Sequence, residues 1–301
     1  MALRVTTMMT ARATVRDLQG DLAELSRLQR KLSSGKEIVR PSDDPYGASL
    51  ALQLRSELDG LRQYQRNVDD GIAWLNASDA ALSKIAEALH RARELLVQGA
   101  SDSAGPRARA AAASEIDQLI ETIKQEGNVQ YAGRYIFAGT RTDTAPYTLL
   151  GPDTYAGNND RIAREIGPRV TLDINVTLDP LLGGGQAAGD DRLLHVLRDI
   201  ADHLRANDGV ALRGTDLQRI DANFDVLNQL RAEVGARTNR LTVAWSRLRS
   251  LEENTTELLS GVEEADTVRT MIEYTTQQAA YNAALKAGAH VVQMSLLDFL
   301  R

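Results

Sequence analysis

Apolar residues recur at every seventh position over two long stretches of the chain. A strict seven-residue spacing is typical of long helices that wind around a partner in a left-handed coiled coil. The two stretches are therefore predicted to be matched helices of a rod. The first carries Leu54, Leu61, Val68, Leu75, Leu82, Leu89 and Leu96, and the second carries Ile220, Leu227, Val234, Leu241 and Leu248.

A third helix is predicted between these two stretches. Gly105-Pro106 precede an alanine-rich run that carries isoleucine and leucine at helical spacing, and Gly127 stands where the run ends. Proline is favoured in the first turn of a helix and glycine just after the last turn. The three helices are expected to pack as an elongated antiparallel coiled-coil bundle, so the fold class is mainly α.

Residues from about 133 to 185 have a different pattern, in which a period of two replaces the period of seven. Val170, Leu172, Ile174 and Val176 alternate with polar residues, as in a half-buried strand. Residues 161–166, followed by Gly167-Pro168, are expected to form the antiparallel partner of this strand. We predict a small β-rich insert that ends at residues 183–185, followed by a short helix over about residues 190–206.

The two ends of the chain carry apolar positions that neither end can bury alone. Residues 1–40 hold eight basic and four acidic residues, and residues 262–301 hold three basic and five acidic ones, so the ends have opposite net charges. We expect the terminal helices to pair antiparallel and to complete their burial against other molecules. The expected assembly positions are Leu18, Leu22, Leu25, Leu32, Val291, Val292, Leu296, Leu297, Phe299 and Leu300, beside a seam of small residues at Ala279, Ala280, Ala283, Ala284 and Ala287.

These patterns predict three domains. Residues 1–40 with 262–301 form a terminal-helix inner domain for assembly, and residues 41–132 with 215–261 form the rod. Residues 133–214 form a β-rich outer domain.

Composition excludes several classes of function. The 301 residues carry a net charge of −6 with both signs interspersed, so neither nucleic acid nor a membrane is an expected partner. The chain has no cysteine, which excludes disulfides and thiolate chemistry. The N-terminus lacks the long apolar stretch of a cleaved signal peptide. No triad, phosphate loop or dinucleotide motif is present, so we expect no enzyme, no cofactor and no metal.

Two clusters of polar residues admit a chemical interpretation beside a structural one. Asp43-Asp44 could form a metal or acid–base dyad, but the following Pro45 favours a helix cap. His195, Asp199 and His203 share one face of a predicted helix and could bind a metal weakly. Polar residues on a helix surface explain them more economically.

Several separated motifs resemble those of a known family. Leu32-Ser33-Ser34-Gly35-Lys36, followed by Pro41-Ser42-Asp43-Asp44-Pro45, is similar to the N-terminal signature of the bacterial flagellin superfamily. The block Gly133–Gly139 (GRYIFAG) and the C-terminal Ser295–Leu300 (SLLDFL) look more like the hook-associated members than like filament flagellins. The resemblance covers residues 1–147 and 215–301.

This resemblance implies a structural adaptor at the junction between flagellar hook and filament. Such a protein is exported unfolded by the flagellar type III apparatus and becomes extracellular. It self-associates in a ring or tube, contacts a neighbouring hook-associated protein and flagellin, and uses an export chaperone. Two alternatives stay open, namely a filament-forming flagellin and a non-flagellar coiled-coil scaffold or secreted effector.

Overall fold

The computed structural model describes residues 7–299, and of residues 7, 8, 10, 11 and 290–299 it describes the backbone alone. The chain divides into two compact units. One unit comprises the residues up to Gly60 together with those from Leu251 onward, and the other comprises Leu61–Ser250. The fold is mainly helical with two small antiparallel sheets, which confirms the predicted fold class.

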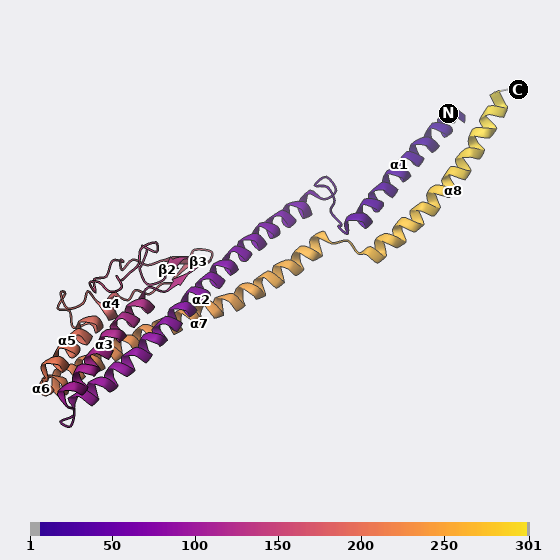
Figure 1. The fold of residues 1–301 in the computed structure, drawn as a ribbon. Coiled ribbons are helices and arrows are strands. Elements are labelled where there is room, and N and C mark those ends of the chain that lie inside the picture. The colour runs from indigo at the N-terminus through magenta and orange to yellow at the C-terminus, as the bar shows by residue number, and fades with distance from the viewer. Residues whose placement is uncertain (1–6, 300–301) are drawn as a thin grey trace. The chain divides into compact units, whose positions relative to one another are not determined.

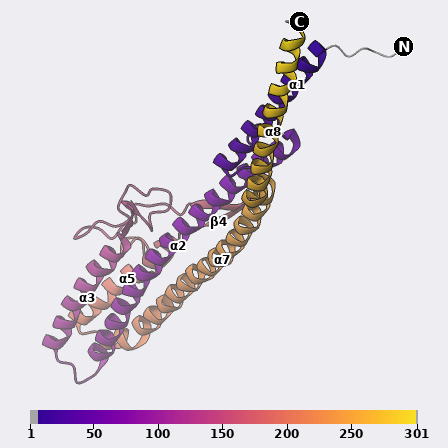
Figure 2. The same cartoon turned by 90° about the vertical axis from the view of Figure 1, so that its right-hand side faces the viewer.

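The first unit pairs the two terminal helices. Helix α1 (Thr7–Ser34) and helix α8 (Thr267–Phe299) lie side by side in both views (Figures 1 and 2). The pair is antiparallel, because Asp21 contacts Gln277 whereas the earlier Thr14 and Leu18 lie against the later Gly288. The expected antiparallel pairing is therefore present.

The link from α1 to helix α2 (Pro45–Ala100) is set by two residues of the predicted turn. Gly35 ends α1 with φ +67°, a conformation that glycine adopts without steric cost, and its N–H donates to the Lys31 carbonyl at 2.9 Å. Asp44 Oδ1 then accepts the N–H groups of Tyr46 and Gly47 at 3.1 and 3.0 Å. Asp44 is thus the N-cap of α2, as its sequence context indicates.

The second unit is built on α2 and helix α7 (Leu217–Glu263), which run antiparallel (Figure 1). Three contacts fix their register: Arg231 pairs with Asp79, His90 packs on Phe224, and Arg93 pairs with Asp221. All heptad positions predicted for the rod are buried along these two helices: Leu54, Leu61, Val68, Leu75, Leu82, Leu89, Leu96, Ile220, Leu227, Val234, Leu241 and Leu248.

Two further helices complete the bundle of the second unit. Helix α3 (Pro106–Gly127) has the predicted bounds and packs against helix α5 (Leu193–Ala206). Both contribute fully buried residues to one continuous core with α2 and α7. The helix predicted at about residues 190–206 falls within the predicted outer domain, and its apolar face, which includes Leu194, Leu197 and Ile200, is part of this core.

Two hairpins lie between α3 and α5. Strands β1 (Gln130–Tyr131) and β2 (Arg134–Tyr135) are joined by Ala132 and Gly133, which both have positive φ, as in a type I′ turn. Strands β3 (Ala163–Gly167) and β4 (Val170–Asp173) pair antiparallel, as predicted. Of the alternating apolar residues, Leu172, Ile174 and Val176 are buried. Val170 is exposed, because it adjoins the turn where the register shifts.

Short helices connect these hairpins to the rod. They are α4 (Asp179–Leu182), α6 (Gly209–Ala211) and the π-helical turn η1 (Leu212–Asp216) that leads into α7. Within the described part of the chain, every helix is too short or too polar to cross a lipid bilayer.

Candidate assembly interface

A buried glutamate holds together the two segments that lead into and out of the terminal helices. Glu263 accepts ion pairs from both Lys36 and Arg55. The Glu37 N–H donates to the Glu263 carbonyl at 2.7 Å, and the Ala265 N–H donates to the Gly35 carbonyl at 3.0 Å. The hydrogen bond from Arg55 lowers the pKa of the Glu263 carboxyl more than burial raises it. The two segments thus form one clasp.

A hollow of about 220 Å³ lies beside this clasp within the same unit. Its wall is largely apolar and includes Pro41 of the turn motif, while Arg40 and Arg55 place positive charge at it. The motif residues therefore do more than end and start helices: they shape a concave surface. It is lined by Lys36, Ile38, Val39, Arg40, Pro41, Ala48, Ala51, Leu52, Arg55 and Glu263.

The contact face of α1 matches the predicted positions in part. Leu18, Leu25 and Leu32 are half-buried, whereas Leu22 is exposed. Leu28, which is 3% exposed, is the most buried leucine of α1 and is absent from the predicted set. Leu28 stands three residues after Leu25, which is the spacing between the two apolar positions of one heptad. This spacing is the sequence signal that identifies Leu28 as a contact residue.

On α8 the predicted alanine seam is mostly not the contact face. Ala284 is half-buried, and the remaining four alanines of the seam are exposed. The contacts with α1 are instead made by Gln277, which donates to Asp21, and by the buried Gly288, which lies against Thr14 and Leu18. Tyr274 and Tyr281, one helical turn to either side of Gln277, are half-buried. The ion pairs of the described α1 and α8 side chains are Arg27–Glu24, Lys31–Glu37 and Arg269–Glu273, and none of these three joins one terminal helix to the other.

Large apolar side chains remain exposed on the terminal helices and on the ends of α2 and α7 beside them. A surface of this kind typically marks a protein–protein contact. Val291, Val292, Leu296, Leu297, Phe299 and Leu300 lie outside the described side chains. The exposed residues of this unit are Met9, Val15, Leu22, Tyr46, Leu52, Leu251, Leu258, Val268, Met271, Ile272 and Leu285.

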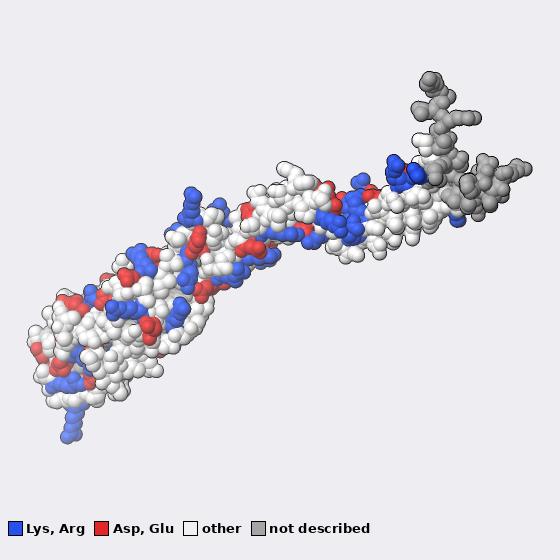
Figure 3. All heavy atoms as spheres, turned by 90° about the horizontal axis from the view of Figure 1, so that it is seen from above, with Lys and Arg blue, Asp and Glu red and all other residues white. Residues whose placement is uncertain are grey.

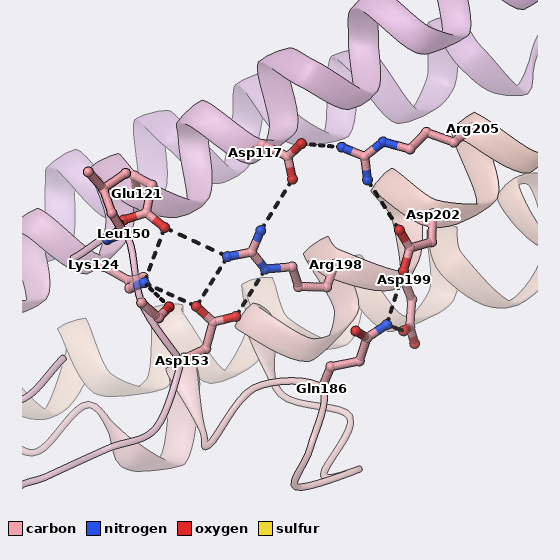
Figure 4. A network of polar contacts seen from close by, with 11 residues as sticks. Asp117, Glu121, Lys124, Leu150, Asp153, Gln186, Arg198, Asp199, Asp202 and Arg205 are labelled. Carbon is pink, nitrogen blue, oxygen red and sulfur yellow. Dashed lines mark hydrogen bonds and ion pairs between the residues drawn. The ribbon is translucent and has the colours of Figure 1, made fainter. Parts of the chain in front are cut away.

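In the second unit, an ion-pair network links α3, α5 and the loop after the first hairpin (Figure 4). Lys124 is fully buried, and its Nζ lies 3.1 Å from both Glu121 and Asp153. Arg198 binds the other oxygen of Asp153 at 3.0 Å and also reaches Asp117. Burial disfavours ionisation of Asp153, but hydrogen bonds from Arg198 and Lys124 outweigh it and lower the pKa of this carboxyl.

The histidines of α5 contact carboxylates at different places. His195 Nε2 lies 3.2 Å from Asp199, while His203 Nδ1 lies 2.7 Å from Asp216 at the end of η1. Asp216 is fully buried, and burial raises its pKa despite the hydrogen bond from His203. Within the described residues no three such side chains converge in a way that could hold a metal. The three residues of the weak metal hypothesis are therefore split between two separate histidine–aspartate contacts.

Charged side chains of both signs are interspersed on the face shown in Figure 3. The fold and these surfaces together define a structural subunit, with paired terminal helices that expose apolar side chains and a rod with a continuous core.

Comparisons with known proteins agree with this class. A model of the bacterial flagellin N-terminal helical region matches residues 5–142, and one of the C-terminal helical region matches residues 217–300. The chain belongs to the bacterial flagellin family, whose members are structural components of the bacterial flagellum.

Individual relatives fall into two groups. Flagellin of Bacillus subtilis is 26% identical, over 99% of this chain and 100% of its own. Flagellar hook-associated protein 3 of Escherichia coli is also 26% identical, over 98% of this chain and 99% of its own. The crystal structure of Bacillus cereus FlgL, at 22% identity, shares the fold with a TM-score of 0.59 over 69% of this chain and 99% of that one.

Proposed function

We propose that this chain is the adaptor between flagellar hook and filament, and that it acts by assembly and not by catalysis. The observation that carries the proposal is the fold match along nearly the full length of a hook-associated structure. The match to hook-associated protein 3 over almost the entire chain supports it. So does the GRYIFAG block, whose Ile136, Phe137 and Ala138 are fully buried at the base of the insert.

In this role the terminal helices assemble with other copies in a ring or tube. The exposed apolar residues of α1 and α8 supply the contact area, and the final apolar residues from Val291 to Leu300 extend it. One side of the ring contacts a neighbouring hook-associated protein and the other contacts flagellin. Export to the cell exterior proceeds through the flagellar type III apparatus with the help of a chaperone. The three-domain division into terminal helices, rod and outer insert belongs to this proposal.

The experiment is deletion of the gene, followed by electron microscopy of the cells and assay of flagellin in the medium. We expect intact hooks without filaments, together with free flagellin, and restoration of filaments by the wild-type gene. Cells that keep filaments attached to their hooks would contradict the adaptor role.

The second candidate is a filament-forming subunit, because the curated relatives include flagellin of full matching length. Immunogold labelling of the wild-type protein separates the two. Label confined to the boundary of hook and filament supports the adaptor, whereas label along the filament supports the flagellin alternative.

A further inference from the structure

Helix α7 carries the charged residues of its second half in two blocks of opposite sign. From Val234 to Ser250 the helix has four arginines and no acidic residue. From Leu251 to its end it has only acidic charged residues, and the next basic residue of the chain is Arg269 on α8. The basic block belongs to the second unit and the acidic block to the first. One helix thus offers two surfaces of opposite charge.

The basic block presents two unpaired arginines beside an exposed valine. Arg240 and Arg247 are exposed, and within the described part of the chain neither guanidinium has an acidic group at ion-pair distance. Val243, which is 68% exposed, follows Arg240 by three residues and precedes Arg247 by four, so the three side chains share one face of the helix. Leu241 and Leu248 are buried in the seam, so this face points away from the core.

The acidic block presents the complementary combination. Glu257 is exposed, and among the described residues no basic group lies at ion-pair distance from its carboxylate. Leu258 beside it is 61% exposed although it is a large apolar residue. Glu257 also stands four residues after Glu253, a spacing at which like charges destabilise a helix. The charge of Glu257 therefore gives its own helix no stabilising contact.

The two blocks cannot satisfy one another within a single chain. Arg247 and Glu257 are about three helical turns apart in α7, whereas side chains of a helix pair across three or four residues. A second copy supplies both missing partners, because its acidic block offers a carboxylate to the arginines and Leu258 to Val243. Opposite charges around an apolar contact orient the partners and favour their encounter.

We propose that the face of Arg240, Val243 and Arg247 in one copy binds the face of Glu257 and Leu258 in the next copy. Because each copy carries both faces, the contact is head-to-tail and repeats, as in a ring or a helical array. The proposal rests on the proposed function only in that copies assemble with one another. It does not depend on whether they form a junction or a filament.

The natural chain has no cysteine, so engineered thiols test the contact directly. Cells express the full-length chain with both Val243→Cys and Leu258→Cys, and sheared flagella with their hooks are treated with a short bismaleimide. We expect a ladder of dimers, trimers and larger species on a denaturing gel, because every copy is joined on two sides. Neither single variant should form this ladder. The matched control carries Val243→Cys with Val210→Cys, whose valine is 77% exposed on α6.

Three outcomes would overturn the head-to-tail contact. The first is a ladder no stronger than that of the control. The second is a dimer without larger species, which would show that two copies close on each other as an antiparallel pair. The third is a dominant cross-link to another flagellar protein, which would show that this protein and not a second copy occupies the face.

Charge reversal in the same cysteine chain provides a second readout. Arg240→Glu with Arg247→Glu should lower the ladder yield at least several-fold, and the further change Glu257→Arg should restore it. Asp225→Arg makes the same change of charge at an exposed position of α7 outside the acidic block, and it should not restore the yield. All four positions are exposed, so the melting temperature of the free chain should change little. An unchanged yield after reversal, or equal rescue by Asp225→Arg, would refute the charge contact.

Failure of the contact and failure of the proposed function are distinguishable. If the chain is present in the isolated hooks but gives no specific ladder, the contact is refuted and the adaptor role stands. If the chain is absent from flagellar structures, the adaptor role fails, and the same cross-linking of the purified full-length variants at high concentration decides the contact.

Discussion

At the scale of the residue, an unusual backbone conformation or complete burial restricts which side chain is favourable at a few positions. Gly35 and Gly20 are both glycines near α1, and an added Cβ would meet no atom within 4 Å at either site. They differ in backbone conformation, because Gly35 has φ +67° whereas Gly20 lies inside the helix. This difference makes them a matched pair for measuring what the helix stop contributes.

Replacing each glycine by alanine should have opposite effects. Gly20→Ala should stabilise α1 by about 0.5–1 kcal/mol, because glycine loses more conformational entropy in a helix. Gly35→Ala should destabilise the end of α1 by about 1–2 kcal/mol, the cost of a left-handed conformation for an alanine. Amide hydrogen exchange of residues 21–34 checks both. Equal protection in the two variants would contradict the assigned helix stop.

Asp216 is a second residue whose effect on stability has a definite sign. Burial raises its pKa in the folded state, although His203 and Arg219 oppose this and Asp199 supports it. The folded protein therefore favours the protonated form. Stability is greatest below the ordinary titration range of aspartate, and it is lost as the pH rises through that range to the raised pKa of the folded state.

Asp216→Asn should accordingly melt at a higher temperature than the wild type at pH 7–8. This advantage should shrink as the pH falls and the wild-type carboxyl becomes protonated. Thermal melts of both chains from pH 8 down to the ordinary titration range of aspartate provide the measurement. Asp225→Asn, at an exposed position of α7, serves as the control. A constant difference between wild type and Asp216→Asn at every pH would argue against a buried, destabilised carboxylate.

At the scale of the element, stability comes from the apolar seam between α2 and α7. Gly71 of α2 faces Leu241 so closely that an added Cβ would lie 3.0 Å from the leucine side chain. Leu241 is fully buried in this seam, whereas Val243 points to solvent two residues further along the same helix. The heptad pattern thus separates inward from outward positions within a single turn.

Leu241→Asp should destabilise the chain by several kcal/mol, because an unpaired charge would enter an apolar interior. Val243→Asp should change the free energy of unfolding by about 0.5 kcal/mol or less, as is usual for an exposed position. Urea unfolding followed by circular dichroism measures both. Similar midpoints for the two variants would show that the seam lies elsewhere.

At the scale of the whole molecule, the two units differ in how completely they bury their large apolar side chains. The second unit buries a continuous core of its own, which joins four helices and both hairpins. The first unit leaves many large apolar side chains exposed on α1, α8 and the neighbouring helix ends. In the proposed assembly, other copies cover these side chains, so order in the first unit depends on incorporation.

Removal of residues 292–301 should therefore abolish incorporation into flagella and leave the unfolding of the second unit unchanged. The reason is that these residues are needed only against neighbouring molecules. Fractionation of sheared flagella measures incorporation, and the thermal melt of the purified chain measures stability. Asp298→Asn, a conservative change within the same segment, should incorporate normally. Wild-type incorporation of the truncated chain would refute the assembly role of this end.

Local periodicity was sufficient to predict much of the fold. The long helices, the bounds of α3, the β3–β4 hairpin and the caps at Gly35 and Asp44 each depend on residues that are neighbours in the chain. The family itself was evident from short motifs near both ends of the chain and from the GRYIFAG block at Gly133–Gly139. In each case, the physical cause acts over one or two turns of backbone, so the amino-acid order alone determines the outcome.

Tertiary structure decided the features that depend on distant partners. Lys124 would be expected in solvent from its type, yet it is buried because Asp153 approaches from another segment. The packing of α5 on α3 and the clasp at Glu263 likewise join residues far apart in sequence. So does the ion network of Lys124, Asp153 and Arg198. Burial and ion pairing depend on the approach of such partners, and periodicity along the chain carries no information about that approach.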